Sequence, residues 1–313
     1  MAKSKAQTHG FDMSTNIDGV DMICHNFGLV KKPEFQLFGD DEGMTGTPHP
    51  KKCARTNTKN DVSGTLAFKP SYDDLSTLIQ LFWTDTAGSG EGDWSGYTSH
   101  DMVSVLNVDM TDTTPDNSFI ALLDTDAEGY TYGVVVANKF TLKFAENQVV
   151  EVELETIAYD EEEGTVSVST AACATPVTTS DLTLSLGATL AEYFAIDGEL
   201  SVTRNFVTRF HNDTNASSVS NGKTEVILSA TLDWNDDTQA DLFALVGTNT
   251  TVLGRLIFTD GTDKVGFDIP EGVISSPTQE RPGDGEYTPS IELSGSYDGT
   301  NEIITAYIDL AGS

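Results

Sequence analysis

The feature that most constrains this chain is an internal repeat. The segment VSGTLAFKPSYDDLSTLIQLFW begins at Val62 with an alternating strand pattern and then becomes amphipathic, and LSATLDWNDDTQADLFALVG repeats that order 166 residues later, from Leu228. A second similarity links VEVELETIAYD, which ends at Asp160, with SIELSGSYD, which ends at Asp298. The repeat predicts two similar β-rich units in one chain, an arrangement that suits a protein that builds a symmetric assembly.

Chain length and local composition indicate where these units begin and end. With 313 residues, the chain is long enough for two units that each bury a core. Residues 1–30 mix Gly, Asp and Asn with isolated apolar residues, which predicts an N-terminal arm that orders only against something else. We place the first unit over residues 31–175 and the second over 176–313, joined by a stretch rich in Ser, Thr and Ala.

Apolar periodicity predicts mostly antiparallel strands in both units, with one short helix on the flank of each. Apolar residues at i, i+3, i+4 and i+7 from Leu75 form one buried stripe, which predicts a helix over residues 72–82. The corresponding helix of the second unit is expected over residues 237–246. The predicted fold class is therefore all-β, with two tandem β-sandwich or barrel domains and one flanking helix in each.

Three long stretches contain turn-forming residues and few apolar ones. They cover residues 39–61, 84–101 and 208–223. The first and the third each precede a copy of the repeated strand, so they occupy corresponding places in the two units. Loops of this length within compact domains are usually functional or disordered.

The charge of the chain restricts its partners. Forty-nine acidic residues oppose 17 basic ones, which gives a net charge of −32 and a pI near 4.1. This field repels DNA, RNA and anionic membranes, and it disfavours sequence-specific binding of nucleic acid. The net negative charge is compatible with a negatively charged surface along which DNA moves without adhering. Selection for solubility, or a salt-adapted host, would produce the same composition.

Targeting signals and cysteine usage point to the cytoplasm as the place of folding. No stretch has the roughly 18–20 apolar residues that a membrane span needs, so we expect no membrane association. The opening MAKSKAQTHGFDMSTN lacks the apolar run of a secretory signal. Cys24, Cys53 and Cys173 are too few and too scattered for a disulfide scaffold, so free thiols are expected.

Two motifs with metal-binding character are weak. The run from Asp124 to Gly129 begins like a calcium loop, but Val135 stands at the twelfth position, which favours a solvated turn. The pair Cys24-His25, and His49 with Cys53 at an H-x3-C spacing, lack the C-x2-C arrangement of strong zinc sites. We therefore expect no metal and no cofactor.

Catalytic motifs are absent from the sequence. It contains no nucleophile elbow, phosphate-binding loop or dinucleotide fingerprint, so we expect no enzyme. Trp83, Trp94 and Trp234 are interpreted as core or interface anchors rather than as a sugar-binding platform.

The order of these motifs resembles that of a known family. A strand of the form VSGTLAF or LSATLDW, followed at once by an Asp-rich turn and a Leu-rich helix, and the closing stretch GFDIPEGVISSPTQERPGDGEYTPSIELSGSYD resemble the tail tube proteins of long-tailed phages and related viruses. The similarity is to the version in which one polypeptide holds two tube domains, and it spans about residue 30 to the C-terminus. It implies two packed β-sheets per unit, and homotrimeric rings of pseudo-sixfold symmetry that stack into a tube.

The resemblance also implies a function and partners. The chain would be a structural virion protein, made and assembled in the host cytoplasm, that forms the tail tube and conducts the genome during ejection. Its partners would be further copies of itself, tape-measure and tail-end proteins, and duplex DNA that passes through the lumen without specific binding.

Two sets of residues become candidates for these contacts. The polar loops supply candidate ring-stacking or neighbour contacts, with the 84–101 loop as a third candidate region: Gly39, Asp40, Asp41, Pro48, Lys51, Lys52, Arg55, His211, Asn212, Asp213, Asn221 and Lys223. Glu151, Glu153 and Glu155 share one side of their strand by alternation and are candidate lumen acids, although they could equally face the exterior.

Other classes of protein fit part of the pattern. A tandem β-sandwich binding module or adhesin would need export, and the missing signal peptide counts against it. Another self-assembling virion component or a secretion tube is the second alternative. A threefold ring of six similar folds would distinguish the tube from an adhesin, which would stay monomeric and bind a ligand.

Overall fold

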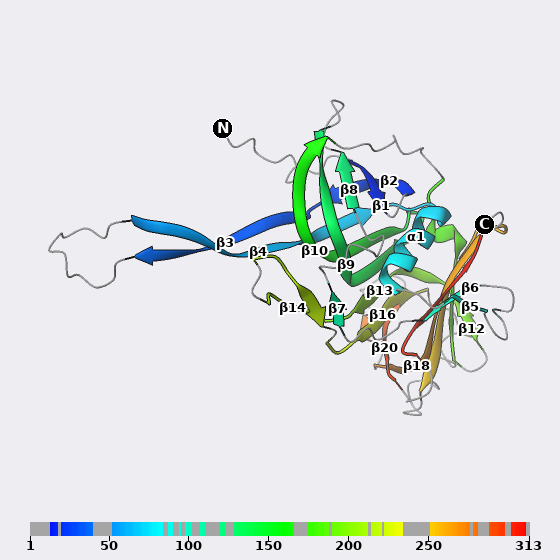
Figure 1. Ribbon diagram of the computed structural model, residues 1–313. Coiled ribbons are helices and arrows are strands. Elements are labelled where there is room, and N and C mark those ends of the chain that lie inside the picture. The colour runs from blue at the N-terminus through cyan, green and yellow to red at the C-terminus, as the bar shows by residue number, and fades with distance from the viewer. Residues whose placement is uncertain are drawn as a thin grey trace.

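The computed structural model describes most of the chain as a strand-rich fold with a long projecting hairpin (Figure 1). The described residues are 13–17, 20–39, 52–83, 87–89, 94, 98–101, 107–109, 119–122, 128–165, 175–187, 190–211, 214–220, 222–233, 251–275, 278–280, 288–297 and 302–310.

Nearly all described elements are strands. Those in the first half of the chain are β1 (Met13–Ile17), β2 (Val20–Phe27), β3 (Val30–Gly39), β4 (Lys52–Phe68), β5 (Ala87–Ser89), β6 (Thr98–Asp101), β7 (Asn107–Asp109), β8 (Phe119–Leu122), β9 (Glu128–Ala145) and β10 (Glu151–Thr165). Those in the second half are β11 (Leu182–Leu186), β12 (Ala191–Tyr193), β13 (Ala195–Thr203), β14 (Val207–Arg209), β15 (Ser218–Ser220), β16 (Glu225–Leu232), β17 (Val252–Thr259), β18 (Lys264–Ile274), β19 (Thr278–Glu280), β20 (Thr288–Gly295) and β21 (Thr305–Asp309). The described helices are α1 (Tyr72–Trp83) and the 3₁₀ turn η3 (Thr179–Asp181).

The strands form one antiparallel sheet of 18 strands and a small sheet of β14, β15 and β7. Within the large sheet, the same order of pairing occurs in both halves of the chain. The first series is β2, β4, β10, β9, β8 and β1. The second series is β13, β16, β20, β18, β17 and β11. Corresponding strands also follow one another in the same sequence order, and the two repeated segments form β4 and β16.

The two series join through a strand pair. Lys139–Ala145 of β9 pairs with Asp197–Thr203 of β13, on the edge of β9 that lies opposite β10. The sheet therefore continues from one half of the chain into the other, and the buried apolar residues form one main cluster. The domain boundary near residue 175 stays a prediction.

Helix α1 confirms the helix predicted over residues 72–82. Ser71 and Asp74 cap its start reciprocally, because Asp74 N donates to Ser71 Oγ (3.2 Å) and Ser71 N donates to Asp74 Oδ2 (3.1 Å). At its end, Trp83 packs edge-on against Phe140 of β9, with ring centroids 5.1 Å apart, and lies 5.6 Å from Phe267 of β18. The helix thus contributes aromatic rings that contact both halves of the sheet.

Three sequence-based expectations need correction. Residues 13–30, expected within an N-terminal arm, instead provide strands β1 and β2 and the buried side chains of Met22, Cys24 and Leu29. The loop expected over residues 39–61 is wrong from Lys52 onward, since β4 starts there. The loop expected over residues 84–101 contains β5 and β6.

Other expectations have different outcomes. Strand β9 is long and runs without a break from Glu128 to Ala145. The loop expected over residues 208–223 contains the end of the short strand β14 and all of β15. The helix predicted over residues 237–246 and Trp234 lie outside the described residues. Within the described part of the chain, no helix combines the length and apolar content needed to cross a membrane.

Candidate assembly surfaces

The β3–β4 hairpin projects from the body of the protein. Val30 lies opposite Ser63 near its base and Gly39 lies opposite Lys52 at its far end. Figure 1 shows the two strands in blue, extending well beyond the remainder of the sheet. β4 is the only described strand with which β3 pairs, so the other edge of β3 is available to a further strand.

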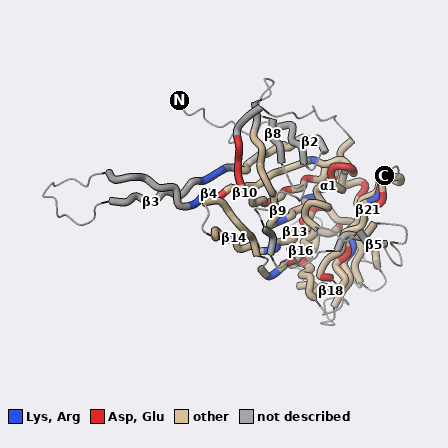
Figure 2. Tube along the Cα trace, viewed as in Figure 1, with Lys and Arg blue, Asp and Glu red and all other residues tan. Residues whose placement is uncertain are grey.

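Polar contacts fix the base of this hairpin. Lys31 Nζ forms an ion pair with Asp160 Oδ1 of β10 at 2.5 Å, and Lys31 N donates to Glu161 Oε2 at 3.1 Å. On β4, Asn60 Nδ2 donates to Asn215 Oδ1 at 2.7 Å. In Figure 2, the basic start of β3 (blue) lies beside an acidic segment of β10 (red). The hairpin therefore leaves the body in a fixed direction.

Residues 204–224 connect β13 to β16 and are called the second arm below. Its first residue, Arg204, is buried, donates from its guanidinium to the backbone carbonyl of Phe82 and stacks on the Phe82 ring at 4.7 Å. Burial lowers the pKa of Arg204 to about 10. Because Phe82 lies in the last turn of α1, the arginine satisfies a terminal carbonyl and ties the second arm to the first half of the chain.

The second arm covers an apolar face of the first half. Val219 of β15 is fully buried against Val134 and Val136 of β9. Ile157 of β10 and Phe206 are partly buried beside them. This small cluster is separate from the main core, and an apolar face of β9 and β10 is thereby removed from water by a segment of the second half.

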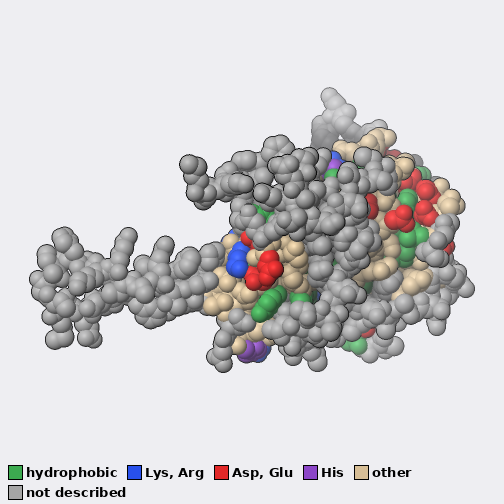
Figure 3. Space-filling view, turned by 45° about the horizontal axis from the view of Figure 1, so that its top comes forward, with side chains coloured by type: hydrophobic (Ala, Val, Ile, Leu, Met, Phe, Trp, Pro, Cys, Tyr) green, Lys and Arg blue, Asp and Glu red, His purple; other side chains and the backbone are tan. Residues whose placement is uncertain are grey.

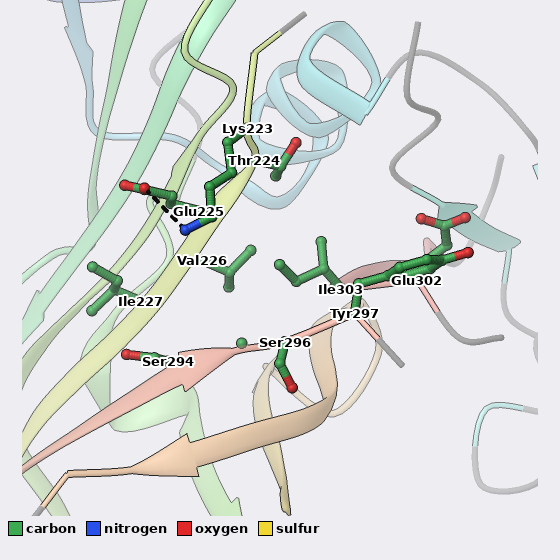
Figure 4. Close-up of a pocket in the computed structure, with 11 residues that line it drawn as sticks. Lys223, Thr224, Glu225, Val226, Ile227, Ser294, Ser296, Tyr297, Glu302 and Ile303 are labelled. Carbon is green, nitrogen blue, oxygen red and sulfur yellow. Dashed lines mark ion pairs between the residues drawn. The ribbon is translucent and has the colours of Figure 1, made fainter. Parts of the chain in front are cut away.

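The corresponding face of the second half is open. Ile227 of β16 lies opposite Ser294 of β20, which lies opposite Val273 of β18. Ile227 is 37% exposed, Val273 47% and Tyr297 64%. A groove of about 680 Å³ here is lined by residues that include Val226, Ile227, Ile303 and Tyr297. In Figure 4, Ile227 and Glu225 lie on one side of β16, and Val226, Ile303 and Tyr297 lie on the other. This groove was not predicted from the sequence, although in the segment EVILSATL buried Val226 and Leu228 alternate with exposed Ile227.

The acids predicted to share a face do so. Val150, Val152 and Leu154 of the same stretch are fully buried, so Glu151, Glu153 and Glu155 point to the opposite side. Lys143 interrupts this acidic face, since its Nζ lies 2.7 Å from Glu153 Oε2. The hydrogen bond that Lys143 donates to Glu153, together with the nearby charges of Glu151 and Glu199, raises the pKa of Lys143. Acidic side chains are also gathered on the face seen in Figure 3.

The candidate loop residues fall into three groups. Gly39 ends β3, and Lys52 and Arg55 lie on β4. His211 and Lys223 are exposed: His211 N donates to Ser217 Oγ at 2.8 Å, and Lys223 forms a 3.6 Å ion pair with Glu225. The remaining candidates lie outside the described residues: Asp40, Asp41, Pro48, Lys51, Asn212, Asp213 and Asn221. The structure thus places the described candidates on the β3–β4 hairpin and on the second arm, and it does not bring them together into one site.

The weak metal motifs gain no further support. Cys24 is buried, and its thiol donates to the backbone carbonyl of Asn26 at 3.1 Å. His49, Cys173 and residues 124–127 are outside the described part of the chain. Among the described residues, no three His, Cys, Asp or Glu side chains form a group that could hold a metal ion.

Comparison with known proteins identifies the family. A family model described as phage tail tube protein matches residues 51–298, which include both repeated strands, the second arm and nearly all of the groove. A search of curated proteins found no match. Since the matched region covers most of the 313 residues, the chain belongs to the phage tail tube protein family and is a structural protein of the virion tail.

Proposed function

We propose that three copies of this chain close into a ring of six similar units and that such rings stack into the tail tube, through which viral DNA passes into the host. The observation that carries the proposal is the twofold occurrence of one pairing order, with β9 of the first series joined to β13 of the second. If the second series offers the next chain the same edge, the sheet continues around a ring, and exposed strand edges disappear.

Two described edges support this closure. β3 pairs only with β4, and β19 pairs only with β20, among the strands that the structure describes. By position in the pairing order, β18 and β19 of the second half correspond to β9, and β2 and β3 correspond to β13. These edges are therefore the ones that a neighbouring chain would use.

The charge fits passage of DNA. A lumen rich in carboxylates repels a polyanion and prevents adhesion, and the net charge of −32 provides such a field. We propose that Glu151, Glu153 and Glu155 line the lumen. We also propose that the β3–β4 hairpin and the second arm contact neighbouring subunits or rings. Tape-measure and tail-end proteins are the further partners that we propose, and the role requires no catalytic residue.

Electron microscopy of the purified chain tests the proposal. Images recorded from low to molar salt, which screens the negative charge, should show rings or hollow tubes whose averages contain three chains and six similar lobes. Analytical ultracentrifugation of the same samples should show trimers or larger species. Monomers at every salt concentration would contradict self-assembly of this chain.

A further inference from the structure

We propose that the groove of the second half, formed by β16, β20 and the segment around Tyr297, is the docking site for the β3–β4 hairpin of a neighbouring copy of this chain. The inference rests on the self-assembly proposed above and names the segment that occupies one specific surface.

The two halves of the chain have equivalent faces. Each half has three adjacent strands whose pairing aligns one residue from each strand into a row on the face turned away from the main core. The rows are Ser63, Ile157 and Val136 on β4, β10 and β9, and Ile227, Ser294 and Val273 on β16, β20 and β18. Both rows contain two aliphatic side chains, so both halves present an apolar face at the same place in the pairing order.

The two rows differ in what covers them. In the first half, Val136 is 6% exposed because the second arm lies across it through Val219 and Phe206. In the second half, no described segment covers Ile227 or Val273, and the groove stays open. Ile227 and Tyr297 line the groove, and Val273 lies beside it, opposite the groove residue Ser294. Exposed aliphatic residues next to an exposed tyrosine are typical of an interaction surface.

Chain order identifies the segment that would cover the open face. The second arm connects β13 to β16, and the β3–β4 hairpin occupies the same place before β4, since β2 and β3 correspond to β13. Within one chain, Lys31 and Asp160 hold the base of the hairpin on the first half. Figure 1 shows it pointing away from β16, β18 and β20. The hairpin that reaches the groove must therefore belong to another copy.

Charge complementarity favours the same occupant. The segment from residue 30 to 60 contains six basic residues, Lys31, Lys32, Lys51, Lys52, Arg55 and Lys59, and four acidic ones, so its net charge is +2 in a chain with a net charge of −32. In the groove, Lys223 pairs with Glu225, while Glu302 and, on the adjoining surface, Glu292 add two further exposed carboxylates. A segment with a small positive charge is therefore suited to approach this acidic surface.

Photo-cross-linking from within the groove tests the proposal. Tyr297 is replaced by benzoylphenylalanine, an aromatic residue of similar shape, and the variant is co-assembled with excess wild-type chain so that a local defect does not prevent tube formation. Irradiation of tubes should give a cross-linked dimer on a denaturing gel, with the partner peptide mapping by mass spectrometry to residues 30–60. The same probe at Val273 should give the same peptide.

A matched control and the alternative outcomes make the test decisive. The probe at Thr262, which is exposed in the turn between β17 and β18, should give no cross-link to residues 30–60. Tubes in which the Tyr297 and Val273 probes map elsewhere, or give no dimer, would overturn the docking site while leaving the tube function intact. A wild-type chain that never forms tubes would instead refute the proposed function, and the docking with it.

A substitution series provides an independent reading. Ile227→Asp places a charge in the groove and should raise the critical concentration for assembly about tenfold or more, whereas Thr262→Asp should leave it unchanged. Circular dichroism of the unassembled chains confirms that both variants fold. Equal critical concentrations for the two variants would contradict the proposal.

Discussion

Trp94 Nε1 donates a hydrogen bond to Asp268 Oδ2 at 2.7 Å, although 174 residues separate the two in the sequence. The same carboxylate accepts two hydrogen bonds from the guanidinium of Arg255, at 2.7 and 2.8 Å, and that guanidinium lies 4.9 Å from the centre of the Trp94 ring. Tyr307 stacks on the indole with ring centroids 4.3 Å apart. A residue from the first half therefore completes a buried polar cluster of the second half.

Removal of the charge of Asp268 should destabilise the protein. Asp268→Asn leaves an acceptor for Trp94 but takes the counter-charge from Arg255, and a buried ion pair that loses one partner typically costs about 3 kcal/mol or more. The free energy of unfolding from urea titration of the unassembled chain measures the effect. Asp309→Asn, on an exposed site of neighbouring β21, is the control and should change this free energy by less than about 0.5 kcal/mol. Equal values for both variants would contradict the prediction.

Gly64 should not tolerate a side chain. A Cβ at this position would lie 2.1 Å from the backbone oxygen of Gly28. Backbone atoms cannot yield as a flexible side chain does, so Gly64→Ala should lower the free energy of unfolding by about 1–3 kcal/mol. Gly133→Ala is the matched control in β9, because nothing lies within 4 Å of its Cβ position. Thermal unfolding of the two variants side by side measures the difference, and a Gly64→Ala protein as stable as the control would refute the close approach.

The turn between β17 and β18 should respond to acid. Asp260 Oδ1 accepts hydrogen bonds from the backbone N–H of Thr262 and of Asp263, both at 2.8 Å, and these bonds hold the pKa of Asp260 below its usual value of 3.8. Since the folded-state pKa is the lower one, this carboxylate stabilises the turn above pH 3.8, and the contribution is lost as the pH falls through the folded-state pKa. The amide NMR signals of Thr262 and Asp263 should therefore titrate below pH 3.8, and Asp260→Asn should abolish that titration. A midpoint above pH 3.8 would be inconsistent with this turn.

The elements that the sequence predicted correctly are those with a buried face. Helix α1 has one apolar stripe, and β4 and β16 alternate, so periodicity alone located them. The outer part of β4, from Lys52, was interpreted as a loop because its sequence, KCARTNTKN, has few apolar residues and no apolar alternation. The pattern that marks a strand with one buried face is therefore missing there.

Contacts between distant segments were beyond prediction for a different reason. Gly64 and Ala230 occupy aligned positions of the repeat, but at Gly64 the backbone of Gly28 leaves no room for a side chain. Likewise, Trp94 stands in a polar segment whose composition indicates a loop, and its burial depends on Gly266, whose Cβ would lie 2.1 Å from the indole. The groove likewise depends on contacts between distant segments, because it is open only where no described segment covers it.

The position of the acidic face can be measured in assembled tubes. Glu155 is exposed and lies on the side of β10 opposite buried Leu154, so a cysteine at this position reports whether that side faces the lumen. In a Cys53→Ser, Cys173→Ser background, where Cys24 stays buried, Glu155→Cys should react with a small maleimide in both tubes and unassembled chains. A maleimide carrying a polymer too large to enter the tube should label only the unassembled chains, because the lumen excludes it. Equal labelling of tubes by both reagents would place Glu151, Glu153 and Glu155 on the exterior, and repulsion of DNA would then have to come from other carboxylates of this chain.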